Sequence, residues 1–163
     1  PIPEIPTTPQ IESQAIHFQT TSSLSWMKNL MTVSNCVSHN KDFQNEIAQL
    51  DSFYYSKDNG KQVAKNLASD KKALIGTYKT FNPWSPVNGY RNPKTGLIYL
   101  NRHNNPRSMK LMVNTAIHER SHHWYKHNGN KRKGLNLESV PYVVGKLAEK
   151  YVEKCEEKLA RLK

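Results

Sequence analysis

The chain lacks any long apolar segment and any sign of a signal peptide. No run approaches the roughly 20 apolar residues that a helix needs to cross a bilayer, so we expect no transmembrane segment. No charged and then apolar stretch opens the sequence. The chain begins at Pro1 without a methionine, and four prolines lie in its first ten residues. The proline-rich opening and the missing methionine favour a secreted or periplasmic protein, with the cytoplasm as the alternative.

Cysteine is scarce as well. Cys36 and Cys155 are too few for a disulfide scaffold, and they lack the paired spacing of a structural zinc site. Two interpretations remain open from the sequence. The cysteines form one long-range disulfide in an exported protein, or they are two inert buried thiols.

Acidic residues are few: 13 Asp and Glu stand against 24 Lys and Arg, for a formal net charge of +11. Such a charge attracts anionic partners, whether nucleic acid, an acidic polysaccharide of a cell wall or a membrane surface. The basic residues are spread along the chain, however, and neither an aromatic RNA-binding motif nor zinc-finger spacing accompanies them. A basic, solvated surface is the simpler interpretation.

The pattern of apolar residues predicts a helix-rich α+β protein. We expect an extended arm over residues 1–12 and a single domain over residues 13–163. Helices are predicted near 22–35, from Asn40, near 61–69, over 108–126 and from about Glu138 to the end. Two strands, 73–80 and 96–101, flank a stretch rich in Pro, Gly and Asn that we expect to be a long loop. The strands would form a small antiparallel sheet.

The segment "TAIHERSHHWYKHNG" (115–129) carries the clearest chemical motif. His118 and His122 are four residues apart on the predicted helix, about 40° apart around its axis and roughly 6 Å apart along it. Two imidazoles placed in this way can bind one zinc ion. Glu119 lies beside them, where a carboxylate can take a proton from a water that the metal activates.

The strand "GLIYLN", the helix "NTAIHERSHHW" and the later "NLESVPY" together resemble the zincin metallopeptidases. The resemblance covers roughly residues 96–145 and rests on His-Glu-x-x-His, with Arg120 at a position where zincins usually have an uncharged residue. It implies a zincin-like active-site helix, a bound Zn²⁺ and cleavage of peptide bonds with Glu119 as general base. It also implies that the strand ahead of the helix, Leu97 to Leu100, is an edge strand that holds the substrate.

A catalytic zinc needs a third protein ligand. The metzincin branch would require Gly and His where this chain has Tyr125 and Asn128, whereas the gluzincin branch takes a glutamate from the following helix. Glu138 is the first carboxylate after His122, so the resemblance predicts Glu138 as the third ligand. His127 is not expected to bind, because on a continuing helix it would face about 100° away from the ligands.

Tyr142 is predicted one turn beyond Glu138, where its hydroxyl could donate a hydrogen bond to the oxyanion of the reaction. The resulting hypothesis is a gluzincin-like zinc peptidase that acts on peptides or proteins, with acidic substrates favoured by the positive charge. Two alternatives are kept: a basic module that binds nucleic acid or another partner, and a zincin that binds zinc without cleaving peptides.

Overall fold

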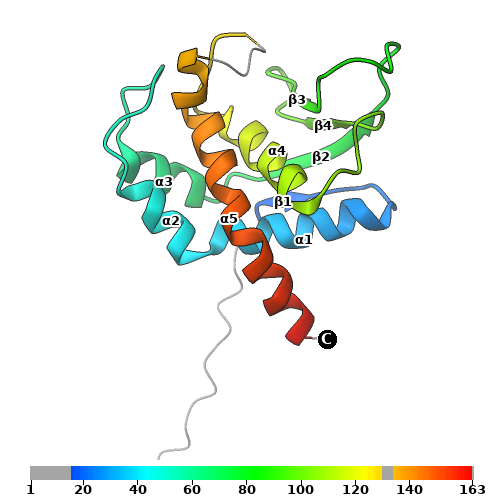
Figure 1. Ribbon diagram of the computed structural model, residues 1–163, viewed down its shortest axis with the longest axis horizontal. Helices are drawn as coiled ribbons and strands as arrows, with labels where there is room; N and C mark the ends of the chain where they lie inside the picture. Colours follow the sequence, from blue (N-terminus) through cyan, green and yellow to red (C-terminus); the bar gives the residue numbers. More distant parts are fainter. Residues whose placement is uncertain (1–15, 130–133, 163) are drawn as a thin grey trace, which may run out of the picture.

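The computed structural model describes residues 16–129 and 134–162, so the predicted arm over residues 1–12 lies outside the described residues. The elements follow in the order β1 (Phe18–Gln19), α1 (Ser25–His39), α2 (Lys41–Ala48), α3 (Gly60–Ala68), β2 (Ala73–Tyr78), β3 (Gly89–Arg91), β4 (Ile98–Asn101), α4 (Met109–Ser121), the 3₁₀ helix η1 (Gly134–Glu138) and α5 (Val140–Arg161) (Figure 1). The helix-rich α+β class predicted from the sequence is confirmed.

The helices begin where the sequence provides side-chain caps. Asn40, Asn59 and Ser108 each accept a hydrogen bond from a backbone N–H in the first turn of α2, α3 and α4. Such caps satisfy donors that the helix itself leaves free. The predicted starts at Asn40 and Ser108 are therefore confirmed. Among the described helices, none is long and apolar enough to cross a membrane.

The sheet differs from the predicted antiparallel pair. Its four described strands have the order β1-β2-β4-β3, in which β1, β2 and β4 are parallel and only β3 is antiparallel. The strands predicted at 73–80 and 96–101 are real, but they run side by side in the same direction. The stretch between them crosses over and supplies β3, a short edge strand within the predicted loop, so the chain returns to β4 through a hairpin.

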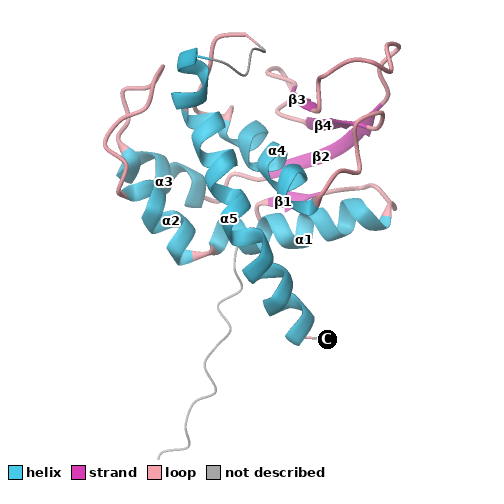
Figure 2. Cartoon of the chain, in the orientation of Figure 1, coloured by secondary structure: helices cyan, strands magenta, loops and turns pink. Residues whose placement is uncertain are grey.

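One hydrophobic core joins the helices to one face of the sheet. Ile75, Ile98 and Leu100 of the sheet belong to this core, together with Val113 and Ala116 of α4. Figure 2 shows the strands stacked at the right of the molecule, with α1 below β1, α4 beside the strands and the other helices to the left. The opposite face of the sheet carries more exposed side chains at alternate positions, as expected for a sheet covered on one side.

Helix α5 packs closely on α4. At their crossing, a Cβ added to Gly145 would lie 2.3 Å from Oδ1 of Asn114, so glycine is required there by the close approach. A disulfide between Cys36 of α1 and Cys155 of α5 ties a third helix to this pair. Of the two interpretations left open by the sequence, the structure therefore shows the disulfide.

Candidate metal centre

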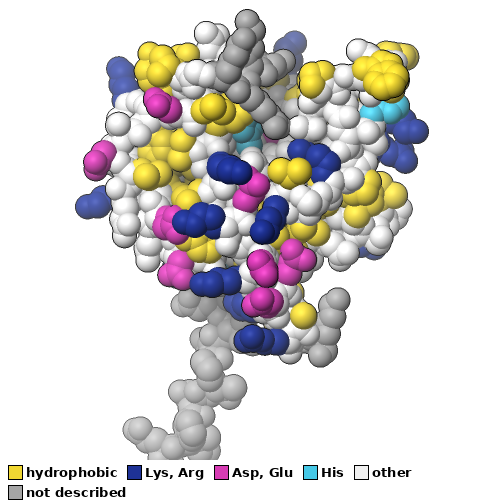
Figure 3. All heavy atoms as spheres, in the orientation of Figure 1, with side chains coloured by type: hydrophobic (Ala, Val, Ile, Leu, Met, Phe, Trp, Pro, Cys, Tyr) yellow, Lys and Arg dark blue, Asp and Glu magenta, His cyan; other side chains and the backbone are white. Residues whose placement is uncertain are grey.

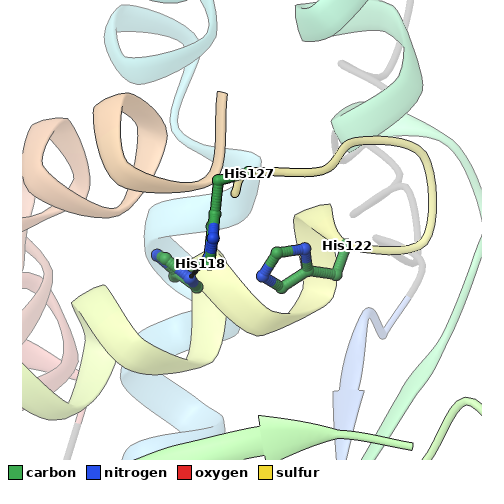
Figure 4. Close-up of side chains that lie close together, drawn as sticks. All are labelled: His118, His122 and His127. Carbon is green, nitrogen blue, oxygen red and sulfur yellow. Dashed lines mark hydrogen bonds between the residues drawn. The ribbon is translucent and has the colours of Figure 1, made fainter. Parts of the chain in front are cut away.

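Three histidines converge at the end of α4. His118 and His122 project from the helix, and His127 comes from the loop that follows it (Figure 4). Their ligand nitrogens all lie within 4.8 Å of one another, and all three side chains are at least partly buried. Nε2 of His118 lies 3.2 Å from Nε2 of His127. Among the described residues, this is the one group of three or more His, Cys, Asp or Glu side chains close enough to hold a metal ion.

The position of His127 corrects the prediction made for it. We expected the helix to continue past His122, which would turn His127 away. Helix α4 instead ends at Ser121 with His122 as its C-cap, and backbone N–H groups of residues 122–125 bond to carbonyls three or four residues earlier in a tight turn. The chain thus folds back over the face of α4 that carries His118 and His122.

Two contacts hold this turn in place. The buried Tyr125 side chain donates a hydrogen bond to Oδ2 of Asp58 and accepts one from Nδ2 of Asn66, each at 2.8 Å. Asn128 and Asn136 then form a double hydrogen bond, from Asn128 N to Asn136 Oδ1 at 3.0 Å and from Asn136 Nδ2 to Asn128 O at 2.6 Å. His127 lies between these two anchors, so its ring is fixed beside the other two.

Glu138, the predicted third ligand, is not part of this cluster. It ends η1, where its side chain is exposed and its carbonyl accepts a hydrogen bond from Tyr54 N at 3.0 Å. The prediction placed Glu138 in the first turn of the last helix, but α5 begins two residues later, at Val140. The sequence could not supply this correction, because the tertiary contacts of Tyr125 and Asn136 decide which residue returns to α4.

Tyr142 does reach the cluster. It lies in the first turn of α5, and its ring centroid is 4.6 Å from that of His118 and 4.8 Å from that of His127. The predicted tyrosine is therefore placed at the histidines by the packing of α5 on α4. This packing brings a phenol to the site without bringing Glu138 to it.

Glu119 is buried, with 8% of its surface exposed. Burial raises the pKa of its carboxyl to about 7, and the positive charge of Arg91 on β3 partly opposes that rise. The charge of Glu119 is also felt by Tyr78 on β2. The carboxyl group thus lies between α4 and the sheet. Arg91 was missed by the sequence interpretation, since it was assigned to a loop.

The carbonyl of Tyr125 fixes the protonation of the His122 ring. Nδ1 of His122 lies 2.9 Å from the carbonyl oxygen of Tyr125, and this oxygen can only accept a hydrogen bond, so Nδ1 carries the hydrogen and donates it. This leaves the lone pair of Nε2 available, as in many histidine–metal sites. Burial lowers the pKa of His122 to about 4, and it also lowers the pKa of His127. Both rings are therefore neutral near pH 7 and need lose no proton to bind a metal.

The spacing of the rings fits a small divalent cation. Two nitrogens bound at roughly 2.0 Å to a tetrahedral ion lie about 3.3 Å apart. The 3.2 Å between the Nε2 atoms of His118 and His127 matches that separation. Three imidazoles could hold such an ion and leave a fourth position for water or substrate, which is the arrangement of catalytic zinc sites.

Arg120, the residue that departs from the zincin pattern, faces away from the site. Only 3% of it is exposed, and its guanidinium donates hydrogen bonds to the carbonyls of Leu67, Ser69 and Lys71 at 2.5 to 3.3 Å. These carbonyls belong to the end of α3 and the connection to β2. The guanidinium of Arg120 thus tethers α4 to these carbonyls and does not belong to the histidine cluster.

The edge of the sheet beside α4 is β3 and not the predicted Leu97–Leu100, since β4 lies between β2 and β3. Strand β3 lies close to α4, because a Cβ added to Gly89 would be 3.1 Å from Cγ2 of Thr115. From the end of β3, Nη2 of Arg91 reaches within 3.2 Å of Nδ1 of His123. The outermost strand of the described sheet therefore ends beside α4.

The interpretation of this centre depends on its own geometry. Comparison of the chain with protein-family models, with curated proteins and with solved structures finds no match.

Proposed function

We propose that the protein is a zinc-dependent peptidase whose metal is held by His118, His122 and His127. The observation that carries this proposal is the convergence of three imidazoles, one of which, His118, directly precedes the buried Glu119 on α4. Compared with the hypothesis from the sequence, the ligand set is three histidines in place of two histidines and Glu138.

Zinc bound at this site would lower the pKa of a coordinated water towards roughly 7 and polarise a peptide carbonyl. Glu119 would accept the proton of the attacking water on a carboxylate oxygen and pass it to the leaving amine. Its burial supports this role, because a carboxyl group with a raised pKa is a better base than an ordinary exposed one. Tyr142 would donate a hydrogen bond from its hydroxyl to the developing oxyanion.

Strand β3 offers a place for the substrate. An extended peptide can add to a free sheet edge through backbone hydrogen bonds. Because β3 lies against α4, such a peptide would pass beside Glu119 and the histidines. This moves the predicted substrate strand from Leu97–Leu100 to Gly89–Arg91.

The first test is metal content together with cleavage. Purified protein, dialysed without chelator, should hold about one zinc per chain, and it should cleave casein or a peptide library. Glu119→Gln should keep the zinc and lose cleavage by at least about 100-fold, because an amide cannot accept the proton of water. Lys110→Ala, an exposed change on the same helix, serves as the control and should retain both zinc and activity.

Three outcomes would contradict the proposal in different ways. Protein that neither retains nor takes up zinc is not a metallopeptidase of this kind. Zinc-loaded protein that cleaves nothing would be the zinc-binding but inactive form. Metal-free protein whose binding to nucleic acid weakens steeply with salt would support the basic interaction module instead.

A further inference from the structure

The loop between β2 and β3, residues 79–88, exposes two aromatic rings to water. Phe81 is 110% exposed and Trp84 is 88% exposed, more than the other large hydrophobic residues of the described chain. In Figure 1 this loop stands out at the upper right, and in Figure 3 hydrophobic side chains form that extremity. Removing these two rings from water would lower the free energy. The exposed pair therefore indicates a binding partner that covers both rings.

The backbone around Trp84 has most of its N–H groups and some of its carbonyls already paired. From residue 83 to residue 87, every backbone N–H is either bonded within the loop or absent: Trp84 N to Asn82 Oδ1 at 3.0 Å, Ser85 N to Asn82 O at 3.2 Å, Val87 N to Ser85 Oγ at 3.3 Å, with proline at 83 and 86. The carbonyls of Ser85 and Val87 accept hydrogen bonds from Asn104 Nδ2, each at 2.8 Å. Polar groups already paired in this way lose little when water is removed.

The charge around the loop is of one sign. Residues 80–90 contain no charged side chain, and no Asp or Glu occurs between Asp70 and Glu119. That interval holds eight basic residues: Lys71, Lys72, Lys79, Arg91, Lys94, Arg102, Arg107 and Lys110. Lys79 and Arg102 are exposed at the base of the loop, where Arg102 N donates a hydrogen bond to Tyr78 O at 2.7 Å. Figure 3 shows basic and histidine side chains just below the hydrophobic extremity.

We propose that this loop docks the protein on an anionic lipid bilayer, with Phe81 and Trp84 entering the headgroup layer and the basic residues facing lipid phosphates. Trp is favoured at this depth because its ring is amphipathic, and clustered Lys and Arg add attraction to anionic lipid. A single-stranded nucleic acid fits less well. It would need rings lying along a cationic groove, whereas these rings stand at the tip of an uncharged loop.

The test measures binding to vesicles by flotation at about 0.1 M salt. Vesicles of phosphatidylcholine with about 30% phosphatidylserine should bind the full chain at least tenfold more tightly than phosphatidylcholine alone. Phe81→Ala/Trp84→Ala should weaken this binding at least tenfold. Ile16→Ala/Leu162→Ala is the matched control, since both residues are apolar and exposed but lie outside the loop. The control should bind as the parent does.

A second pair separates charge from insertion. Lys79→Glu/Arg102→Glu should weaken binding at least tenfold, because each lost cation near an anionic surface costs about fivefold and each new anion adds repulsion. Lys154→Glu/Lys158→Glu on α5 should cost much less. All variants change exposed residues, and circular dichroism checks that they are folded.

The proposal is overturned if the parent binds neither vesicle, or binds both equally. It is also overturned if the loop variants lose binding to a thymidine 20-mer while the parent ignores vesicles, since the loop would then be a nucleic-acid site. Neither zinc nor peptidase activity enters these measurements, so they stand apart from the function proposed above.

Discussion

At the scale of single residues, the site depends on His127, which the sequence interpretation had set aside. The three imidazole nitrogens lie within 4.8 Å of one another, whereas Glu138 is exposed at the end of η1. His127→Ala should therefore weaken zinc affinity at least tenfold. Loss of a residue that only supports a metal ligand already costs about tenfold or more, and loss of the ligand itself should cost at least as much. Competition with a chelating dye measures this affinity.

Glu138→Ala is the matched change for that experiment and should leave zinc affinity within about threefold of the parent, a margin far below the cost of losing a ligand. If Glu138→Ala releases zinc and His127→Ala does not, the ligand set predicted from the sequence is restored and the geometry described here does not hold in solution.

Tyr142 provides a second prediction at this scale. Its ring lies 4.6 Å from that of His118, at the histidine cluster, and under the proposed function its hydroxyl would donate to the oxyanion. Tyr142→Phe should keep the zinc and lower kcat about 100-fold, the cost of removing one donor from an oxyanion site. The KM should change little, since the ring remains.

A purely structural role for Tyr142 predicts another pattern. The melting temperature of Tyr142→Phe would then fall while kcat per folded molecule stayed at the parent value. Measuring kcat and thermal unfolding on the same preparation distinguishes the two roles. Tyr55→Phe, an exposed tyrosine in the α2–α3 connection, controls for loss of a hydroxyl elsewhere.

At the scale of elements, Arg120 fixes α4 to the chain between α3 and β2. Its buried guanidinium bonds to three backbone carbonyls and lies 5.8 Å from the ring of Phe18 and 5.5 Å from that of Trp124. Arg120→Met keeps the apolar stem but leaves those acceptors without a donor. We expect the free energy of unfolding to fall by at least about 3 kcal/mol in urea denaturation, because each of the three unsatisfied buried acceptors costs about 1–3 kcal/mol.

Lys110→Ala is again the comparison, since it lies on α4 and is exposed; it should change the free energy of unfolding by less than about 0.5 kcal/mol. Should Arg120→Met prove as stable as the parent while losing peptidase activity, Arg120 would belong to the chemistry and its role as a tether would be rejected.

The elements also show what a sequence can reveal. Local signals placed α2 and α4, because Asn40 and Ser108 cap them and apolar residues recur at helical spacing. The pairing of β2 with β4 was wrong in direction, since strand patterns carry no information on orientation. The strand β3 is only three residues long and exposes Tyr90, so it lacks the alternation that would identify it.

The residues of the candidate site also differ in whether a local sequence pattern or a long-range contact places them. His118, Glu119 and His122 follow from spacing on one helix, whereas Tyr142 was predicted from its distance to Glu138 and reaches the histidines through the packing of α5 on α4. His127 depends on contacts far away in the chain. Tyr125 reaches Asp58 and Asn66, which lie 67 and 59 residues earlier, and those bonds end the helix at the right point. No pattern within residues 115–129 encodes them.

At the scale of the whole molecule, the disulfide closes a large part of the chain. Cys36 and Cys155 are separated by 119 residues, so the bond restricts the unfolded chain severely.

Cys36→Ser/Cys155→Ser should lower the free energy of unfolding by about 2–5 kcal/mol in urea denaturation, since a disulfide that closes a longer loop removes more conformational entropy from the unfolded chain. Zinc affinity should stay within about threefold of the parent, because Tyr142 and Cys155 are about 20 Å apart along α5. Equal unfolding free energies for the parent and the double variant would show that the bond does not stabilise the fold. Loss of zinc by a folded double variant would instead mean that the position of α5, and with it the metal centre, depends on this bond.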